Sequence, residues 1–369
     1  MIIRTVKINI KLEESTKGIM LETMKQVQFI YNTFVNYCCI NKTCSYPTLH
    51  KTYYRKTVEQ FYNFPTGLLQ SIAKNACSSV KSFNRNNKGK KWQYIGQKKT
   101  LQLPLNVLTF SLRGNLATIS SVRKRQRFLI KIPEWFTKKY KIENTNKVQF
   151  ATLNYFDNQF QLNLAYKVEG GIKKENGNII GIDRGLYNLA TLSDGTKYTN
   201  SKNHSIKRKY AYNRAILQSV GTKSAKRKLK KLSGKEKRYM REVNHCITKK
   251  LADRTDVSTY VLEDLKNIRK TEERLSKKVR TWISNWSFAE FESQLRYKCE
   301  ISGIAVETVD PHYTSQKCNA CGTIDKTART KSRYICKICG NTDHADINAS
   351  KNIRDNYIRS LKTKQAEFN

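Results

Sequence analysis

Residues 318–353 read CNACGTIDKTARTKSRYICKICGNTDHADINASKNI, and in this segment a set of four cysteines with metal-binding spacing is followed closely by an aspartate. It contains two Cys-x-x-Cys pairs, each followed by a glycine that lets the backbone turn tightly, and 14 residues separate the pairs. Four thiolates at this spacing predict a zinc ribbon with a closed tetrahedral shell, which leaves no position for water or substrate. We therefore expect one structural zinc ion with four ligands, Cys318, Cys321, Cys336 and Cys339.

The carboxylate belongs to Asp346, seven residues after Cys339, at the start of the helix-like run ADINASKNIRDNYI. Taken by itself, this acid is equally consistent with a charge partner of the helix N-terminus. The ribbon has little hydrophobic core of its own. We expect it to be a rigid insertion that holds the following helix, and with it Asp346, against a larger sheet.

Two other acids end short apolar strands in the second half of the chain. The run IIGI leads to Asp183, and the run VSTYVLE ends at Glu263. A single acid after a strand is more often a turn or capping residue, but Asp183, Glu263 and Asp346 can converge if the strands are neighbours. Clustered carboxylates need cations, and hard oxygen ligands favour Mg²⁺ or Mn²⁺. Two such ions about 4 Å apart could hydrolyse a phosphodiester.

The composition points to a nucleic-acid partner. The 369 residues include 70 Lys and Arg against 29 Asp and Glu, a formal charge of +41, while 38% of the residues are hydrophobic. The chain can therefore bury a core, and its charge opposes folding unless a polyanion neutralises it. A basic ribosomal protein and a membrane-surface protein are the alternatives that composition leaves open.

The chain divides into two predicted domains. Residues 1–175 form a β-barrel or sandwich with a helical insertion at about 15–100, and residues 176–369 form an α/β domain. Within the second domain, residues 201–253 predict a basic helical hairpin suited to lie along phosphates, and residues 312–342 form the zinc ribbon. The fold class is therefore α+β and multidomain.

Smaller features of the first domain support this division. Apolar and polar residues alternate over residues 5–12, which indicates a strand and not a signal peptide, and no run is long enough to span a membrane. Residues 148–168 predict a β-hairpin with its turn at Asp157 and Asn158. Six further cysteines are expected to be ordinary thiols, namely Cys38, Cys39, Cys44, Cys77, Cys246 and Cys299.

Four segments together resemble one protein family. They are GIDRGLYNLATLSDG, YVLEDLKNI, WISNWSFAEFESQLRYKCEISGIAVETVDPHYTSQKCNACG and CKICGNTDHADINASKNI. They are similar, in order and spacing, to the split RuvC motifs, bridging helix and zinc ribbon of transposon-encoded TnpB proteins, and to the related compact type V CRISPR effectors. The resemblance covers the last half of the chain, and the first half agrees only in pattern.

The resemblance implies a fold and a set of site residues. The second domain would be RNase H-like (RuvC), and the first a wedge β-barrel with helical recognition elements. Asp183, Glu263 and Asp346 would be the catalytic Mg²⁺ ligands, and the four cysteines the zinc ligands. Many relatives have D-R-D before the N-A pair, whereas this chain has Asp343, His344, Ala345 and Asp346. We choose Asp346 because it keeps the D-x-N-A register, and we expect His344 to contact phosphate or a metal ligand.

The resemblance also implies an activity and its partners. The chain would be an RNA-guided DNA endonuclease of a transposable element, and a guide RNA would pair with double-stranded target DNA beside a short flanking motif. Tyr46, Gln70 and Lys74 in the first domain are candidate readers of that motif. The protein would act in the prokaryotic cytosol or nucleoid, without a membrane.

Other interpretations remain at this point. A compact type V CRISPR effector would take its guide from a repeat array. An RNA-guided repressor without cleavage would normally lack one of the three acids, and all three are present here. A zinc-ribbon protein that binds nucleic acid without a guide would not need three acids in this order.

Overall fold

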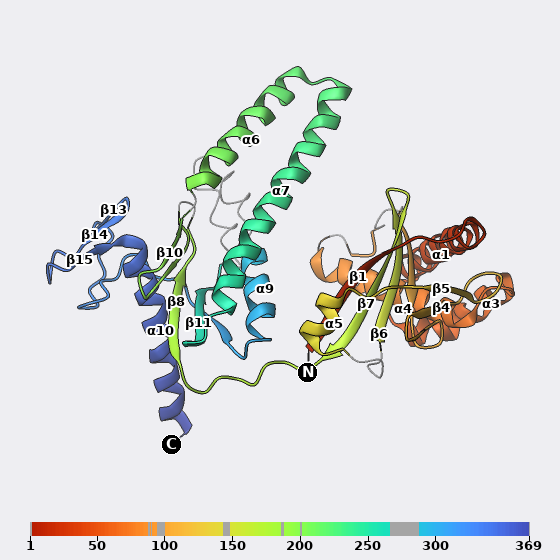
Figure 1. Ribbon diagram of the computed structural model, residues 1–369, viewed down its shortest axis with the longest axis horizontal. Coiled ribbons are helices and arrows are strands. Elements are labelled where there is room, and N and C mark those ends of the chain that lie inside the picture. Colours follow the sequence, from red (N-terminus) through yellow and green to blue (C-terminus); the bar gives the residue numbers. More distant parts are fainter. Residues whose placement is uncertain are drawn as a thin grey trace. The chain divides into compact units, whose positions relative to one another are not determined.

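The computed structural model describes residues 2–87, 89, 91–93, 100–142, 148–185, 188–199, 201–265 and 288–368. Contacts divide the chain into two compact units, Met1–Glu169 (unit 1) and Gly170–Asn369 (unit 2) (Figure 1). The basic, glycine-containing sequence RNNKGKKWQYIGQKK at 85–99 predicts a loop, and part of it lies outside the described residues. Residues 282–287, at the start of the segment that resembles the bridging helix, also lie outside them. None of the helices within the described ranges is long and apolar enough to cross a membrane.

Unit 1 contains two antiparallel sheets. The four-stranded sheet has the order β1-β7-β6-β2, formed by β1 (Ile2–Ile10), β7 (Gln159–Val168), β6 (Val148–Phe156) and β2 (Leu101–Leu105). The predicted hairpin is confirmed, since β6 and β7 pair and Asp157 and Asn158 at its turn have φ of 49° and 60°. The smaller sheet consists of β3 (Phe110–Arg113), β4 (Leu116–Ile119) and β5 (Gln126–Leu129).

Helices lie between β1 and β2 in the sequence of unit 1. Two long helices, α1 (Glu14–Ile40) and α4 (Thr66–Asn86), pack on each other through buried apolar side chains. Between them lie three short elements, α2 (Tyr46–Leu49), the π-helical turn η1 (His50–Tyr54) and α3 (Arg55–Gln60). The short helix α5 (Glu134–Tyr140) follows the smaller sheet.

Unit 2 is built on a five-stranded sheet of order β10-β9-β8-β11-β12. Its strands are β10 (Lys197–Thr199), β9 (Asn188–Leu192), β8 (Asn178–Asp183), β11 (Val257–Glu263) and β12 (Ala305–Val309). β8, β11 and β12 run parallel, whereas β9 pairs with β8 and β10 in antiparallel fashion. The strands predicted to end in Asp183 and Glu263 are therefore neighbours in one sheet.

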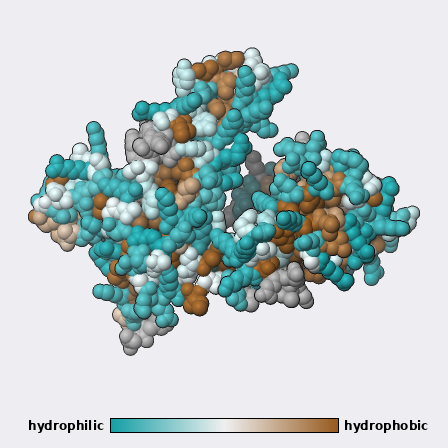
Figure 2. All heavy atoms as spheres, viewed as in Figure 1, coloured by the Kyte–Doolittle hydropathy of each residue, from teal (hydrophilic) through white to brown (hydrophobic). Residues whose placement is uncertain are grey.

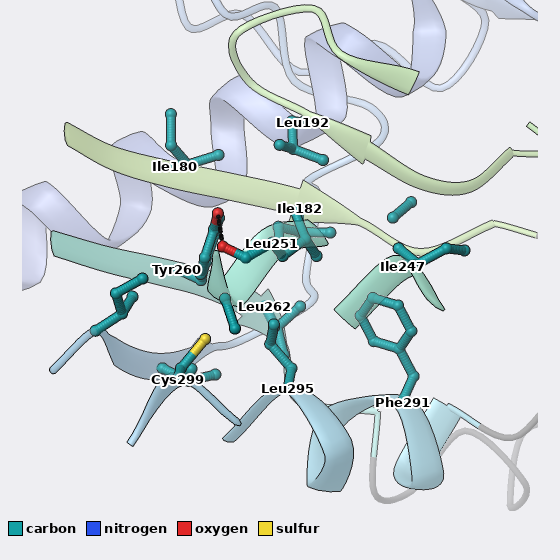
Figure 3. Close-up of a cluster of buried hydrophobic side chains, with 14 of the residues drawn as sticks. Ile180, Ile182, Leu192, Ile247, Leu251, Tyr260, Leu262, Phe291, Leu295 and Cys299 are labelled. Carbon is teal, nitrogen blue, oxygen red and sulfur yellow. Dashed lines mark hydrogen bonds between the residues drawn. The ribbon is translucent and has the colours of Figure 1, made fainter. Parts of the chain in front are cut away.

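One face of this sheet is covered by α7 (Lys223–Ala252) and α9 (Phe288–Cys299). Figure 3 shows Phe291 and Leu295 of α9 and Ile247 of α7 gathered against side chains of β8 and β11. The buried Tyr260 hydroxyl in β11 donates a hydrogen bond of 2.8 Å to the carbonyl of Leu251, at the end of α7. This bond satisfies a polar atom that burial would otherwise leave unpaired.

The predicted helical hairpin is present as α6 (Ser201–Val220) and α7 (Figure 1). Gly221 has a φ of 64°, and the Thr222 hydroxyl accepts a hydrogen bond from the Ala225 N–H and so begins α7. The hairpin surface is mostly hydrophilic, with apolar residues exposed on α6 (Figure 2). These exposed residues are spaced four apart, at Tyr212, Ile216 and Val220.

The zinc-ribbon segment and the last helix complete unit 2. The segment carries three short antiparallel strands, β13 (Arg329–Thr330), β14 (Arg333–Ile335) and β15 (Thr342–His344). β15 leads directly into α10 (Ala345–Phe368), which packs on β8, β9, β11 and β12. Because Ile180 and Ile182 face α7 and α9, the alternation of a strand turns Gly181 toward α10.

Gly181 allows α10 to approach the sheet backbone. A Cβ atom at this position would lie 2.0 Å from the Ser350 carbonyl oxygen and 2.7 Å from the Arg354 nitrogen, both in α10. Backbone atoms cannot yield as a flexible side chain can. The glycine is therefore needed for α10 to lie against β8.

We predict that Gly181→Ala lowers the free energy of unfolding of unit 2 by about 3 kcal/mol, because the added methyl group forces α10 away from β8. Hydrogen exchange of β8 and α10 peptides measures this loss. The same substitution at the exposed Gly18 in α1 meets no atom within 4 Å. There it should stabilise unit 1 by about 0.5–1 kcal/mol. Unchanged protection of α10 in Gly181→Ala would contradict the prediction.

Candidate functional site

Three carboxylates come together at one end of the unit 2 sheet. Asp183 ends β8 and Glu263 ends β11, and the parallel register pairs the residues just before them, Ile182 with Leu262. Asp346 is the second residue of α10, which packs on β8. The Asn188 amide at the start of β9 donates a hydrogen bond of 2.8 Å to Asp346 Oδ2. Two strand ends and one helix start thus form a single acidic centre.

The electrostatics of this centre favour an added cation. Burial, together with the negative charges of Glu263 and Asp346, raises the pKa of the Asp183 carboxyl to about 8, although the charges of Arg329 and Arg184 oppose this rise. Burial also raises the pKa of Glu263, which the Thr314 hydroxyl and the two arginines hold down. Because desolvation and like charges penalise the ionised acids, a cation that binds there would relieve that penalty.

Two arginines and a threonine at the centre were not predicted. The buried Arg184 guanidinium donates hydrogen bonds to the Glu263 and Phe288 carbonyl oxygens and lies 3.6 Å from Glu292 Oε2. Arg329 in β13 donates to Asp346 Oδ1 at 2.9 Å. The Thr314 hydroxyl donates to Glu263 Oε1. Arg184 directly follows Asp183, a signal that could have been used, but nothing in the sequence singles out Thr314 or Arg329.

The four predicted zinc ligands are together. Their Sγ atoms all lie within 4.8 Å of one another, and within the described ranges no other group of three or more potential ligands is so placed. The Cys318–Cys339 and Cys321–Cys336 Sγ distances are 3.7 Å and 3.6 Å. Bonds of about 2.3 Å to a tetrahedral zinc ion require sulfur atoms about 3.8 Å apart. The residues therefore fit a structural zinc ion.

The two glycines of the cluster have the predicted role. Gly322 and Gly340 have φ values of 82° and 71°, a region that other residues rarely adopt. Each N–H donates to the carbonyl oxygen of the first cysteine of its pair, at 2.9 Å for Cys318 and 3.0 Å for Cys336. The six other cysteines are free thiols elsewhere in the chain, as expected.

Buried amides connect the ribbon to α10. Asn348 accepts a hydrogen bond from the Asn319 N–H at 3.0 Å and donates to the Lys317 carbonyl oxygen at 2.8 Å. One turn later, Asn352 donates to the carbonyl oxygens of Thr314 and Lys317 at 2.9 Å and 2.7 Å. The ribbon thus fixes the helix that carries Asp346.

Asp343 and His344 have different surroundings from Asp346. The Asp343 carboxylate forms an ion pair of 2.7 Å with Lys351 on α10. His344 Nδ1 accepts a hydrogen bond of 3.3 Å from the Asp346 N–H, so this side chain caps the first turn of the helix. The geometry therefore favours Asp346 over Asp343 as a member of the acidic centre.

The three residues nominated in unit 1 are neighbours. The Lys74 ammonium group lies 5.1 Å from the centre of the Tyr46 ring. Gln70, one turn before Lys74 on α4, lies beside the Tyr54 hydroxyl and opposes the rise in the pKa of Tyr54 that burial causes. Lys74 is exposed, and Tyr46 and Gln70 are partly exposed, so a partner can reach this patch.

Two family models match the chain. A model described as a probable transposase matches residues 163–272, which contain Asp183 and Glu263. A model of the Cas12f1-like TNB domain matches residues 288–353, which contain Asp346 and the four cysteines. The two matches cover every residue of the acidic centre and the cysteine cluster.

Several proteins are similar to this chain over part of its length. CRISPR-associated endodeoxyribonuclease Cas12f1 of Sulfoacidibacillus thermotolerans is 28% identical over 217 residues, which cover 53% of this chain and 50% of that protein. The putative RNA-guided DNA endonuclease InsQ of Escherichia coli K12 is 32% identical, covering 47% and 48%. The TnpB-like protein MJ0751 of Methanocaldococcus jannaschii is 32% identical, covering 34% and 45%. The chain thus matches about half the length of these relatives.

Solved structures share the fold. A Cas12f1–sgRNA–target DNA complex superposes with a TM-score of 0.65 and 14% identity, covering 93% of this chain and 83% of that one. The mini-RNA-guided endonuclease CRISPR-Cas_phi3 superposes with a TM-score of 0.58 and 13% identity, covering 95% and 92%. At such low identity these similarities establish a common fold.

We predict that Cys336→Ser releases zinc, because a hydroxyl is a poor substitute for a thiolate ligand. Metal analysis should find one zinc ion in the parent protein and much less in the variant. Hydrogen exchange should rise at residues 346–352, which the ribbon holds in place. Cys246→Ser, at an exposed cysteine on α7, should leave both readouts unchanged. A purified parent protein without zinc would overturn this interpretation.

We also predict that unit 2 loses stability as the pH rises from about 4 to about 8 in magnesium-free buffer. The unfolded chain loses the Asp183 proton near its ordinary pKa of 3.8, whereas the folded protein keeps it until about 8. Asp183→Asn should flatten this profile and, at pH 7, stabilise unit 2 on the order of 2 kcal/mol. The exposed Asp253→Asn is the control. Hydrogen exchange of β8 across this pH range measures the effect, and equal profiles for parent and Asp183→Asn would refute it.

Proposed function

The chain is related to the TnpB-like proteins and the Cas12f1 endonucleases, and from this relationship we propose that it is an RNA-guided DNA endonuclease. One observation carries the proposal. Asp183, Glu263 and Asp346 come from three separate segments of the sequence, meet at one sheet end, and lie beside a four-cysteine cluster inside the regions that the family models match.

The fold of unit 2 agrees with this activity. A five-stranded mixed sheet, with α7 and α9 on one face and α10 on the other, suits the RNase H-like (RuvC) domain that the resemblance implies. In such a domain, the strand ends present acids to a nucleic-acid backbone. We assign the four-cysteine segment as its zinc ribbon and unit 1 as the domain that reads the flanking DNA.

Asp183, Glu263 and Asp346 would hold two Mg²⁺ or Mn²⁺ ions, because all three offer the hard oxygen ligands that these ions prefer. Such ions activate a water molecule and stabilise the leaving oxygen of a phosphodiester. The chain's own residues orient the ligands. Thr314 holds one oxygen of Glu263, and Asn188 holds one oxygen of Asp346.

Sequence recognition would be divided between RNA and protein. Base pairing with a guide RNA would select the target strand, and the protein would read only a short flanking motif in duplex DNA. Gln70 and Lys74 on α4, with Tyr46 beside them, would contact base edges there, since amide and ammonium groups can reach the major groove. The basic hairpin α6/α7 would bind phosphates.

Protein purified from cells that also express its genomic neighbourhood should carry one defined RNA that survives moderate salt. With Mg²⁺, the complex should cut DNA that matches the variable end of this RNA and leave mismatched DNA intact. Asp346→Ala should reduce cleavage by at least about 10³-fold, comparable to the loss of a catalytic group, and leave DNA binding unchanged. Asp343→Ala, which removes an acid paired with Lys351, should keep most of the cleavage.

Each outcome distinguishes between the candidate functions. Defined RNA and matched binding without cleavage would favour the repressor, and a mixture of cellular RNA with no guided cutting would favour a protein without a guide. The DNA downstream of the gene identifies the RNA source, because a structured element end indicates a transposon and repeats indicate a CRISPR array. Full cleavage by Asp346→Ala would remove that residue from the centre.

A further inference from the structure

A cavity of about 420 Å³ lies in unit 1, at the start of α4. Its wall is formed by the first residues of α4, by Leu108 and Thr109, and by the loop that joins β4 to β5. That loop contributes three basic residues in succession, Arg123, Lys124 and Arg125. No residue that lines this cavity is acidic, so the cavity is suited to an anion.

The start of α4 offers free donors to this cavity. Among the described residues, the N–H groups of Thr66 and Gly67 have no hydrogen-bond acceptor, and both residues line the cavity. Helix N-termini carry partial positive charge and bind phosphate through such groups. Gly67 also lets the Thr109 side chain lie close to the start of α4, because a Cβ atom at Gly67 would be only 3.0 Å from Thr109 Cγ2.

Ser120 independently indicates a ligand. This residue is only 7% exposed, lines the cavity, and its hydroxyl has no hydrogen-bond partner within the described part of the chain. The oxygen of this hydroxyl is not sealed from solvent, and because Ser120 lines the cavity, it opens onto the cavity. Because the described residues supply no partner for this hydroxyl, a ligand in the cavity could accept a hydrogen bond from it.

The basic loop is held in shape before any ligand binds. The Ser121 hydroxyl donates to the Lys124 carbonyl oxygen at 2.5 Å, and the buried Thr23 hydroxyl on α1 accepts from the Val122 N–H at 3.2 Å. The Arg125 guanidinium donates to the Leu108 carbonyl oxygen at 3.3 Å. The Arg123 guanidinium lies 3.3 Å from Glu22 Oε2, so among these three basic residues Lys124 alone has a side chain with neither an ion pair nor a hydrogen bond to the described residues.

We propose that this cavity binds one backbone phosphate of the duplex DNA that flanks the target, through Ser120, Lys124 and the start of α4. The inference rests on the proposed function. Thr66, Gln70 and Lys74 are spaced four apart and follow one side of α4, so the cavity lies about 6 Å along the helix from Gln70. A duplex read by Gln70 and Lys74 would thus place its backbone near the cavity. The phosphate contact would set the position of α4 on the DNA, and the base contacts would supply sequence specificity.

Neutral methylphosphonate linkages, placed one at a time in the target duplex, test the proposal on the guide-loaded protein. The parent should lose affinity at one linkage beside the flanking motif. Lys124→Gln, alone and combined with Ser120→Ala, should bind the normal duplex several-fold more weakly and lose nothing further at that linkage. Lys167→Gln, an equal charge loss at an exposed site on β7, should keep the parent's pattern.

An interference pattern in the variants that equals that of the parent would overturn the proposal. The proposal would also be overturned if the variants became insensitive to a neutral linkage in the guide RNA and not to one in the DNA. If no guided binding exists, the proposed function fails and the cavity is tested on guide-free duplex binding. There Lys124→Gln should reduce the slope of log affinity against log salt by about 1, whereas Lys167→Gln should not. An unchanged slope would refute the phosphate site.

Discussion

The side-chain amides of Asn348 and Asn352 are the contacts on which the acidic centre depends. They donate to the carbonyl oxygens of Thr314 and Lys317, and so bind α10 to the segment that leads into the first cysteine pair. Thr314 in turn holds Glu263 through its hydroxyl. One short segment therefore connects the strand that carries one acid with the helix that carries another. The ribbon has only a small apolar cluster of its own. These buried hydrogen bonds therefore hold the ribbon segment against α10, a role that a hydrophobic interface fills in domains with a larger core.

The sequence predicted those parts of the centre whose signals are local. Cysteine spacing identifies a cluster without knowledge of the fold, and an apolar run that ends in an acid marks a strand end. β8 and β11 end where they were expected to end, and the four thiols lie together. Arg329 and Thr314 were missed because their contacts arise only when the ribbon folds back on the sheet. Arg329 lies in a segment rich in lysine and arginine, where one basic residue is not distinguishable from another.

Unit 1 shows the same limit in another form. Alternation and turn chemistry predicted the β6/β7 hairpin. The arrangement of all the strands of unit 1 into two separate sheets depends instead on contacts between residues far apart in the sequence. The helical patterns were visible, but the π-helical turn His50–Tyr54, which stacks the His50 ring on Tyr54 at 4.5 Å, has no sequence signature. Likewise, the cavity at the start of α4 combines residues from helix and loop that no linear motif would group.

The charges of the chain act in opposite directions at long and short range. A net charge of +41 draws a polyanion toward the protein, yet the acidic centre repels the phosphate that would be cleaved. Arg184 and Arg329 partly balance the three acids. The pKa of Asp183 is still raised to about 8, first because burial disfavours its ionised form and then because the charges of Glu263 and Asp346 outlast this partial balance. The centre therefore retains a demand for positive charge that side chains do not meet. The proposed divalent ions would meet it, and because they bind phosphate oxygens as well as carboxylates, they would also turn local repulsion of the substrate into attraction.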